Sequence, residues 1–241
     1  MKVKIIGLGG VGCSLLKTLP QFLTFWRGHG KEEDGEENKT EMVLIDGDSF
    51  EAKNRDRQTF VEVGNKAEVL HASLSQEWPR LWFEAMAEYV TADNVVVLIR
   101  EGDVLFLAVD NHATRKLVSD RCQELCDVLL ISGGNEFTDG NIQVFWRKDG
   151  QNMTLPLASE FHKEILYPQD KSPSEMGCEE LAERGGEPQL LITNNAVAVA
   201  MLNAFYAFLE GKLNYDEVYL DILTGNTRQV QRESYLNHTT T

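Results

Sequence analysis

Short apolar runs alternate with helix-like segments along the first part of the chain. The runs are continuous rather than alternating with polar residues, which is typical of parallel strands buried on both faces. They cover residues 3–6, 42–45, 95–99, 104–109 and 128–132. Between them, apolar residues recur at helical spacing. We therefore expect helices over 11–25, over 66–89 in two pieces broken near Pro79, and over 113–126.

The remainder of the chain changes character. A strand is predicted at 142–146 and is followed by a long polar segment, 147–190. Segments of that length inside a compact domain are usually functional or mobile. An apolar helix over 194–209 and a hairpin of strands 217–223 and 227–233 complete the pattern, before a frayed tail at 237–241. The prediction is one α/β domain over 1–236 with a Rossmann-like, mainly parallel sheet, helices on both faces, antiparallel strands and a C-terminal hairpin.

The charge balance argues against some classes of partner. The 241 residues include 23 Lys and Arg and 38 Asp and Glu, giving a net charge of −15. Such a chain is not expected to bind nucleic acid or an anionic membrane through general electrostatics. The acidic stretch 30–41 reads as a solvated loop. No apolar run approaches the roughly 18 residues of a membrane span, and the opening strand pattern leaves no room for a signal peptide.

Cysteine and histidine usage gives no sign of a metal centre. Cys13, Cys122, Cys126 and Cys178 form no CxxC pair, so we expect a reduced, cytoplasmic chain with no zinc. The first three of these are most simply core residues, and the histidines form no spaced cluster. The group of Trp78, Trp82 and Phe83 is expected in the core or at an interface rather than as a stacking platform.

A glycine motif follows the first predicted strand and precedes the first predicted helix. Gly7, Gly9, Gly10 and Gly12 satisfy G-x-G-x-x-G, in which the missing side chains allow the backbone to approach a phosphate. Asp46 closes the second strand, where an acid commonly accepts hydrogen bonds from ribose hydroxyls. The alternatives are a plain tight turn and a loop or capping aspartate. Together the glycine motif and Asp46 predict a nucleotide site.

The segment after Asp46 carries the more informative chemistry. A dehydrogenase does not need cations here, whereas an enzyme that cleaves ATP between the α and β phosphates does, because negative charge builds on the α-phosphoryl oxygens and on pyrophosphate. Taken singly, each residue also fits a solvated surface position. The residues are Asp48, Asn54, Arg57, Gln58 and Lys66.

This ensemble resembles the ThiF/MoeB family and the adenylation domains of ubiquitin-activating enzymes. The matching stretches are GLGGVG at 7–12, IDGDSFEAKNRDRQ at 45–58, GNK at 64–66, LAVDN at 107–111 and SGGNEFTDGNIQVF at 132–145. The resemblance implies that the glycine loop lies against ATP and that Asp46 holds the ribose. It further implies that Asn54, Arg57 and Lys66 contact the triphosphate, with Gln58 supporting the loop.

The same resemblance extends to a metal and a nucleophile. Asp110 matches the magnesium-binding aspartate of the family, with Asn111 beside it; the alternative is that Asp110 caps the helix beginning near residue 113. Cys178 lies in the segment that resembles the family's crossover loop, where some relatives use a cysteine as acceptor. Its acidic neighbours would raise the pKa of a thiol, so an ordinary loop residue stays an alternative.

The function implied is ATP- and Mg²⁺-dependent adenylation of the C-terminal carboxylate of a small ubiquitin-like or sulfur-carrier protein ending in Gly-Gly, by a homodimer. Three departures mark a minimal, divergent member, similar to ThiF-like proteins of bacterial mobile elements. They are the lack of paired CxxC zinc ligands, the lack of an N-terminal helix that donates an arginine, and the acidic insertion. The alternatives are an NAD-dependent oxidoreductase, which lacks a plausible proton donor, and a non-catalytic nucleotide-binding scaffold.

Overall fold

A twisted sheet runs through the molecule in the computed structural model, which describes residues 1–26, 40–55, 58, 60–176 and 190–231. Within these ranges the sheet has nine strands, eight of them in the order β11-β10-β8-β7-β6-β1-β2-β5. The parallel strands are β5 (Trp82–Met86), β2 (Glu41–Ile45), β1 (Lys2–Ile6), β6 (Val104–Leu107) and β7 (Val128–Asn135). Antiparallel strands extend it: β8 (Asp139–Lys148), β10 (Glu217–Asp221), β11 (Asn226–Val230) and β9 (Gln151–Asn152), which pairs with β8. The predicted fold class is confirmed.

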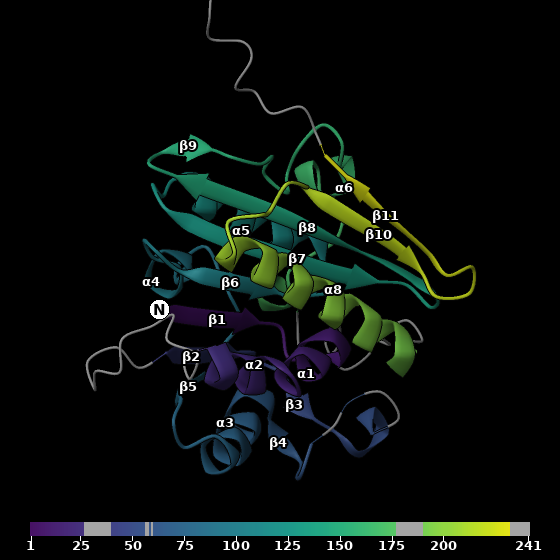
Figure 1. The fold of residues 1–241 in the computed structure, drawn as a ribbon. Coiled ribbons are helices and arrows are strands. Elements are labelled where there is room, and N and C mark those ends of the chain that lie inside the picture. The colour runs from purple at the N-terminus through teal and green to yellow at the C-terminus, as the bar shows by residue number, and fades with distance from the viewer. Residues whose placement is uncertain (27–39, 56–57, 59, 177–189, 232–241) are drawn as a thin grey trace, which may run out of the picture.

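Helices cover both faces of this sheet (Figure 1). One face holds α1 (Gly10–Leu16), α2 (Leu19–Trp26), α3 (Lys66–Glu77) and α8 (Leu191–Leu209). The other holds α4 (Val95–Leu98), α5 (His112–Gln123) and α6 (Lys163–Leu166). Alternate strand residues serve the two cores: Phe106 packs in the first, whereas Leu105 and Leu107 pack in the second. Smaller elements are β3 (Ser49–Phe50), which pairs with β4 (Gly64–Asn65), and the 3₁₀ turns η3 (Ala52–Asn54) and η4 (Pro173–Glu175).

Helix α8 lies against β7 and β8 at close range (Figure 1). An added Cβ on Gly133 would stand 2.4 Å from Sδ of Met201, and one on Gly140 would stand 2.5 Å from a methyl carbon of Val197. Both distances are shorter than any van der Waals contact, so glycine is required for this approach. By length and composition alone α8 is long and apolar enough to cross a membrane. Here its Val197, Met201 and Phe205 are fully buried against the sheet.

Several predicted elements were wrong in type or extent. The run 95–99 forms the short helix α4 rather than a strand, because a continuous apolar run fits either structure when it is buried. The helix predicted over 66–89 ends at Glu77, and β5 follows it as the edge strand beside β2. The helix predicted over 11–25 divides into α1 and α2.

One side-chain prediction was wrong, and for Trp82 the core alternative is excluded while the interface alternative stays open. Cys126 is exposed rather than in the core, because α5 has already ended at Gln123. Trp82 is 61% exposed on the edge strand, whereas its neighbour Phe83 is buried as expected. Cys13 and Cys122 are buried, and burial raises the pKa of the Cys122 thiol.

A buried ion pair closes the amino-terminal end of the parallel strands. Nζ of Lys4 lies 2.5 Å from Oδ2 of Asp103 and donates a hydrogen bond to the carbonyl of Leu98 at 2.6 Å. Lys4 and Asp103 are each 3% exposed. Burial lowers the pKa of Lys4, against the opposing effect of Asp103. The pair therefore fixes β1 to the start of β6.

Removing one partner of this pair should be costly. We expect Asp103→Ala to lower the free energy of unfolding by about 3–5 kcal/mol, because it leaves a buried ammonium without its counter-ion. Urea denaturation measures the change. The control is Glu41→Ala, which breaks the Lys2–Glu41 pair, whose side chains are 38% and 31% exposed, and should cost less than about 1 kcal/mol. Equal losses in the two variants would contradict the assignment.

Candidate active site

A cavity of about 1390 Å³ opens at the carboxyl ends of the central strands. Its lining includes the last residues of β1 and β2 and the segment directly after β6. The chain passes from β1 to β2 on one side and returns to β6 on the other, so β1 and β6 flank the point where the strand order reverses. Parallel α/β sheets bind ligands at such a point. Polar residues from the β7–β8 end and from β10 and β11 line its outer part.

The glycine loop forms one wall of this cavity. Gly7 has φ +89°, a left-handed conformation, and an added Cβ would lie 2.8 Å from the backbone of Ala108. A Cβ on Gly12 would come within 2.1 Å of the Gly7 carbonyl oxygen. At Gly9, by contrast, the nearest atom would be Nε2 of Gln58 at 4.0 Å, so a side chain there would project into open space. Gly7, Gly9 and Gly10 all line the cavity, and their bare backbone fits a phosphate group.

Asp46 connects this loop to the end of β2. Its Oδ2 accepts a hydrogen bond from the Leu8 amide at 2.6 Å and its Oδ1 accepts one from the Asp48 amide at 2.8 Å. The side chain of Asn65 donates to the Asp46 carbonyl. Burial raises the pKa of Asp46, which is 8% exposed. The carboxylate predicted to meet a ribose therefore also holds the glycine loop in place.

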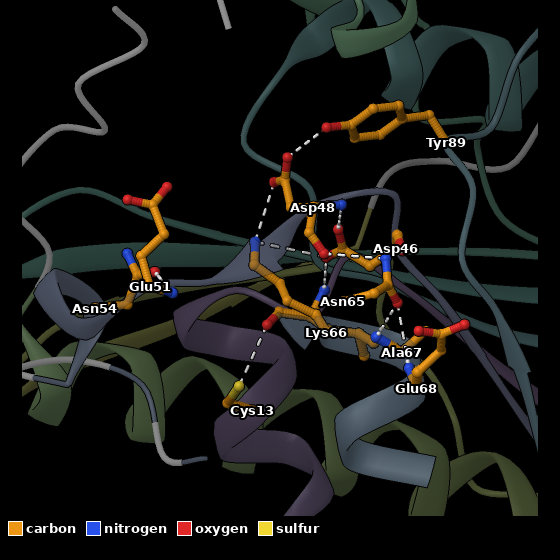
Figure 2. Close-up of polar contacts among 11 residues, drawn as sticks. Cys13, Asp46, Asp48, Glu51, Asn54, Asn65, Lys66, Ala67, Glu68 and Tyr89 are labelled. Atoms are coloured by element: carbon orange, nitrogen blue, oxygen red, sulfur yellow. Dashed lines mark hydrogen bonds and ion pairs between the residues drawn. The ribbon is translucent and has the colours of Figure 1, made fainter. Parts of the chain in front are cut away.

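Lys66 enters the cavity at the first residue of α3 (Figure 2). The side chain of Asn65 caps this helix by accepting hydrogen bonds from the amides of Ala67 and Glu68. The cap fixes the start of α3 at Lys66. Nζ of Lys66 donates to Oδ2 of Asp48 at 3.0 Å and lies 3.8 Å from Oδ2 of Asp46. The helix start thus aims one ammonium group at two carboxylates.

The two carboxylates determine the charge of this lysine. Burial favours the neutral amine, but Asp46 and Asp48 outweigh it and raise the pKa of Lys66. On its other oxygen Asp48 accepts a hydrogen bond from the Tyr89 hydroxyl, so Asp48 lies between Tyr89 and Lys66 (Figure 2). The ring of Tyr89 covers Gly47, where an added Cβ would lie 2.8 Å from ring carbons. Lys66 is therefore a charged, oriented donor inside the cavity.

The structure brings together most of the other residues predicted for the phosphates. Asn54 ends η3, is buried, and accepts a hydrogen bond from the Glu51 amide while lining the cavity. Gln58 also lines it, and among the described residues its Oε1 is a buried atom with no hydrogen-bond partner. Arg57 and Cys178 lie outside the described residues, so their predicted roles stay predictions.

Asp110 and Asn111 follow β6 and take different positions. Asn111 is the N-cap of α5 and accepts a hydrogen bond from the Thr114 amide, so the capping role considered for Asp110 belongs to Asn111. Asp110 is exposed to the cavity. Within the described ranges, no group of three His, Cys, Asp or Glu residues is arranged to hold a metal ion. Asp110 fits Mg²⁺ in the manner this ion favours, with one carboxylate and the remaining ligands from water and phosphate.

Three residues at the site were missed from the sequence. Tyr89 was hidden inside the predicted helix over 66–89. Arg115 is 7% exposed, and its Nη2 donates to the carbonyls of Val109 and Gly133, which ties the ends of β6 and β7 together. Its position five residues after Asp110, on the helix that β6 feeds, was the available signal. Asp170 bonds to the start of α5 from the distant segment after α6, which no local pattern reveals.

A buried histidine anchors the segment that crosses this side of the cavity. Nε2 of His162 lies 2.8 Å from Oε1 of Glu217 on β10, and Nδ1 lies 3.1 Å from Oε1 of Glu164. The Tyr219 hydroxyl donates to the other Glu217 oxygen at 2.7 Å. Burial opposes the imidazolium, but Glu217 and Glu164 outweigh it and raise the pKa of His162.

Comparison with known proteins adds relatives to this geometry. The model for the ThiF family matches residues 1–237. The molybdopterin-synthase adenylyltransferase of Escherichia coli is 28% identical over 169 residues, which are 68% of this chain and 61% of that protein. The adenylyltransferase and sulfurtransferase MOCS3 of Drosophila virilis is 29% identical over 147 residues, 59% of this chain and 29% of that protein. The chain thus spans less than two thirds of the length of these relatives.

Solved structures share the fold. Escherichia coli MccB superimposes with a TM-score of 0.68 at 18% identity, covering 95% of this chain and 62% of that one. PaaA gives a TM-score of 0.67 at 14% identity, covering 95% of this chain and 72% of that one. At such identities the likeness concerns the arrangement of strands and helices.

The histidine anchor should make stability depend on pH. Because the folded state raises the pKa of His162, its contribution is complete below the unfolded value of about 6.5 and is lost as pH rises through the folded pKa. We expect the urea midpoint of the wild type to fall from about pH 6 to about pH 9 more than that of His162→Gln. His71→Gln, which changes a histidine on α3, should keep the wild-type slope. Parallel curves for wild type and His162→Gln would contradict the anchor.

Proposed function

The chain belongs to the ThiF family, and on that premise we propose that it is an ATP-dependent adenylyltransferase that activates the terminal carboxylate of a small protein. The observation that carries the proposal is the cavity wall itself: bare glycine backbone, the charged Lys66 and the buried Asn54 face one space at the strand reversal. The relatives named as adenylyltransferases support it. MccB, which shares the fold, has been solved with ATP and with MccA.

The proposed reaction joins a carboxylate to the α-phosphorus of ATP. One carboxylate oxygen forms a bond to the α-phosphorus. The bond between the α-phosphorus and the oxygen that bridges it to the β-phosphorus breaks, and pyrophosphate leaves with that electron pair. An acyl-adenylate is the other product. No general base is required, since a terminal carboxyl group with a pKa of about 3.5 is already ionised at neutral pH. The protein therefore contributes position and charge.

The residues divide this work. The glycine loop receives the phosphates against its backbone, and Asp46 accepts hydrogen bonds from the ribose while it holds the loop. Lys66 turns from Asp48 to the phosphoryl oxygens, and Asn54 and Arg57 complete the contacts. Asp110 would hold Mg²⁺, which when bound neutralises charge on the phosphates. Transfer to Cys178 is the proposed second step in the event that the product is a thioester.

The partner is proposed to be a ubiquitin-like or sulfur-carrier protein ending in Gly-Gly. The space beyond the nucleotide wall supports an extended tail: it is lined by Gly133, Gly134 and Gly140 and by residues of β10 and β11. Backbone rather than side chains of these glycines lines that part of the cavity, which suits an extended glycine tail.

We further propose a homodimer in the cytoplasm. Helix α8 carries no charged residue, although the chain has a net charge of −15. On its outer side Ile192, Val199 and Tyr206 are 62%, 51% and 49% exposed, and they recur at heptad spacing along one face. This uncharged face, which also presents the exposed Asn195 and Asn203, is a surface on which two copies of an acidic protein meet without charge repulsion.

Loss of the charge at Lys66 should slow adenylation. We expect Lys66→Gln to lower the rate of carrier-dependent ATP–pyrophosphate exchange by about 10²–10³-fold, the effect of removing one donor to transition-state charge. Because the substitution also removes a cation beside the buried Asp46, urea denaturation checks that the variant is folded. Lys116→Gln is the matched control, because Lys116 pairs with Asp120 at 2.7 Å outside the cavity lining. Unchanged exchange in Lys66→Gln, or tighter binding of NAD than of Mg·ATP by the wild type, would overturn the proposal.

The role of Asp110 is tested by its isostere. Asp110→Asn keeps the shape of the side chain and removes the charge that Mg²⁺ favours. We expect the magnesium concentration that gives half-maximal exchange to rise, while the melting temperature changes little because Asn111 supplies the helix cap. Exchange is measured across a magnesium titration. A large loss of stability with an unchanged magnesium requirement would assign Asp110 to structure instead.

A further inference from the structure

The amino-terminal turn of α5 already holds a carboxylate. The amides of His112 and Ala113, the first two residues of the helix, donate to Oδ2 and Oδ1 of Asp170 at 2.6 Å and 3.1 Å. The third amide, that of Thr114, is taken by the N-cap Asn111. Asp170 thus binds through both oxygens to the amides that the cap leaves open. It comes from the segment between α6 and η4, far away in sequence.

The position of Asp170 allows another anion to replace it on the α5 amides. Asp170 is exposed, and its bonds to α5 lie at exposed positions. Both Asp170 and the start of α5 line the cavity, together with the glycine loop. Since β6 is the direct neighbour of β1, the helix that follows β6 begins beside the loop that receives the phosphates. A carboxylate on the α5 amides is therefore a neighbour of the phosphate wall.

Orphaned polar atoms mark the same place. In the part of the chain that the structure describes, Nε of Arg115 and Nδ1 of His112 are buried and have no hydrogen-bond partner. Arg115 is 7% exposed and lies one turn along α5 from His112, on the same side of the helix. Its bond to the Val109 carbonyl brings the guanidinium group back beneath the first turn. Arg115, His112 and Asp170 line one cavity, so a buried cation with an unused donor lies near the α5 turn, although it makes no direct ion pair with Asp170.

The charges around Arg115 make exchange more favourable than addition. Burial lowers the pKa of Arg115, and Asp110, Asp170 and Glu164 act against that effect through their charges. A further anion placed beside these three acids would meet repulsion. An anion that replaces Asp170 leaves the local charge unchanged.

From these contacts we infer that the α5 turn, with Arg115, is the subsite for the substrate's terminal carboxylate, and that Asp170 occupies it in the substrate-free protein. The inference rests on the proposed function only in taking that carboxylate to belong to the substrate. Binding of the carboxylate releases Asp170, and with it the segment between α6 and η4 that crosses the cavity. The attacking group is then held beside the α-phosphate, and the vacated segment is free to close over the tail.

The test measures binding without turnover. N-acetylglycylglycine and its C-terminal amide are titrated into the wild type and Asp170→Asn, without nucleotide, and followed by protein NMR. We expect Asp170→Asn to bind the acid at least about threefold more tightly than the wild type does, with the amide unchanged, because the competing charge has gone. Asp139→Asn is the matched control: it removes one exposed acid from the same cavity, away from α5. It should leave the preference for acid over amide as in the wild type.

Further arms identify the donor and the anion. Adding Arg115→Lys to Asp170→Asn keeps the charge and removes the Nε donor, and should abolish the gain; urea denaturation of each variant shows that it is folded. Equal gains for acid and amide, an equal gain in Asp139→Asn, retention of the gain in the double variant, or a gain for inorganic phosphate in place of the acid would each overturn the inference. A gain for the acid in a protein that shows no ATP–pyrophosphate exchange would keep the subsite and remove the adenylation proposal.

Discussion

One buried carboxylate organises the nucleotide half of the cavity. Asp46 accepts hydrogen bonds from the amides of Leu8 and Asp48. The glycine loop, the end of β2 and the following turn therefore share a single acceptor. The same group approaches Lys66 and helps to keep it charged. A charged acid at a buried position is favourable only with such partners, since desolvation is otherwise uncompensated. The loop is therefore shaped before any ligand arrives.

Much of this half could be predicted because its signals are local. The glycines and Asp46 stand at strand ends whose positions the apolar runs reveal, whereas Asn54 and Lys66 were identified from the family resemblance. The predicted element type was wrong where a continuous apolar run hides the helical or strand periodicity. Residues 95–99 would be apolar in either structure, and their helical form depends on packing against α5. The edge strand β5 was missed because it is stabilised by pairing with β2, which lies far from it in the sequence.

The outer half could not be predicted because distant segments build it. Asp170 meets α5, and His162 meets Glu217 on β10, across separations that no sequence window spans. These contacts link the segment between β9 and α8 to α5 and to β10. Long-range polar contacts hold both halves of the cavity, but in the nucleotide half the bond between Leu8 and Asp46 joins residues just after two strands that the apolar runs predict.

The close packing of α8 against the sheet couples the hydrophobic core to the shape of the cavity. Gly133 and Gly140 line the cavity with their backbone, and their missing side chains admit Met201 and Val197 from behind. At these glycines the floor of the cavity is thus only one peptide layer thick, with a core helix directly beneath it. Changing the volume of a residue on the buried side of α8 would raise or lower that floor while every polar group stayed in place. Adaptation to a new tail is then open to substitutions that never touch the ligand, by way of the hydrophobic core.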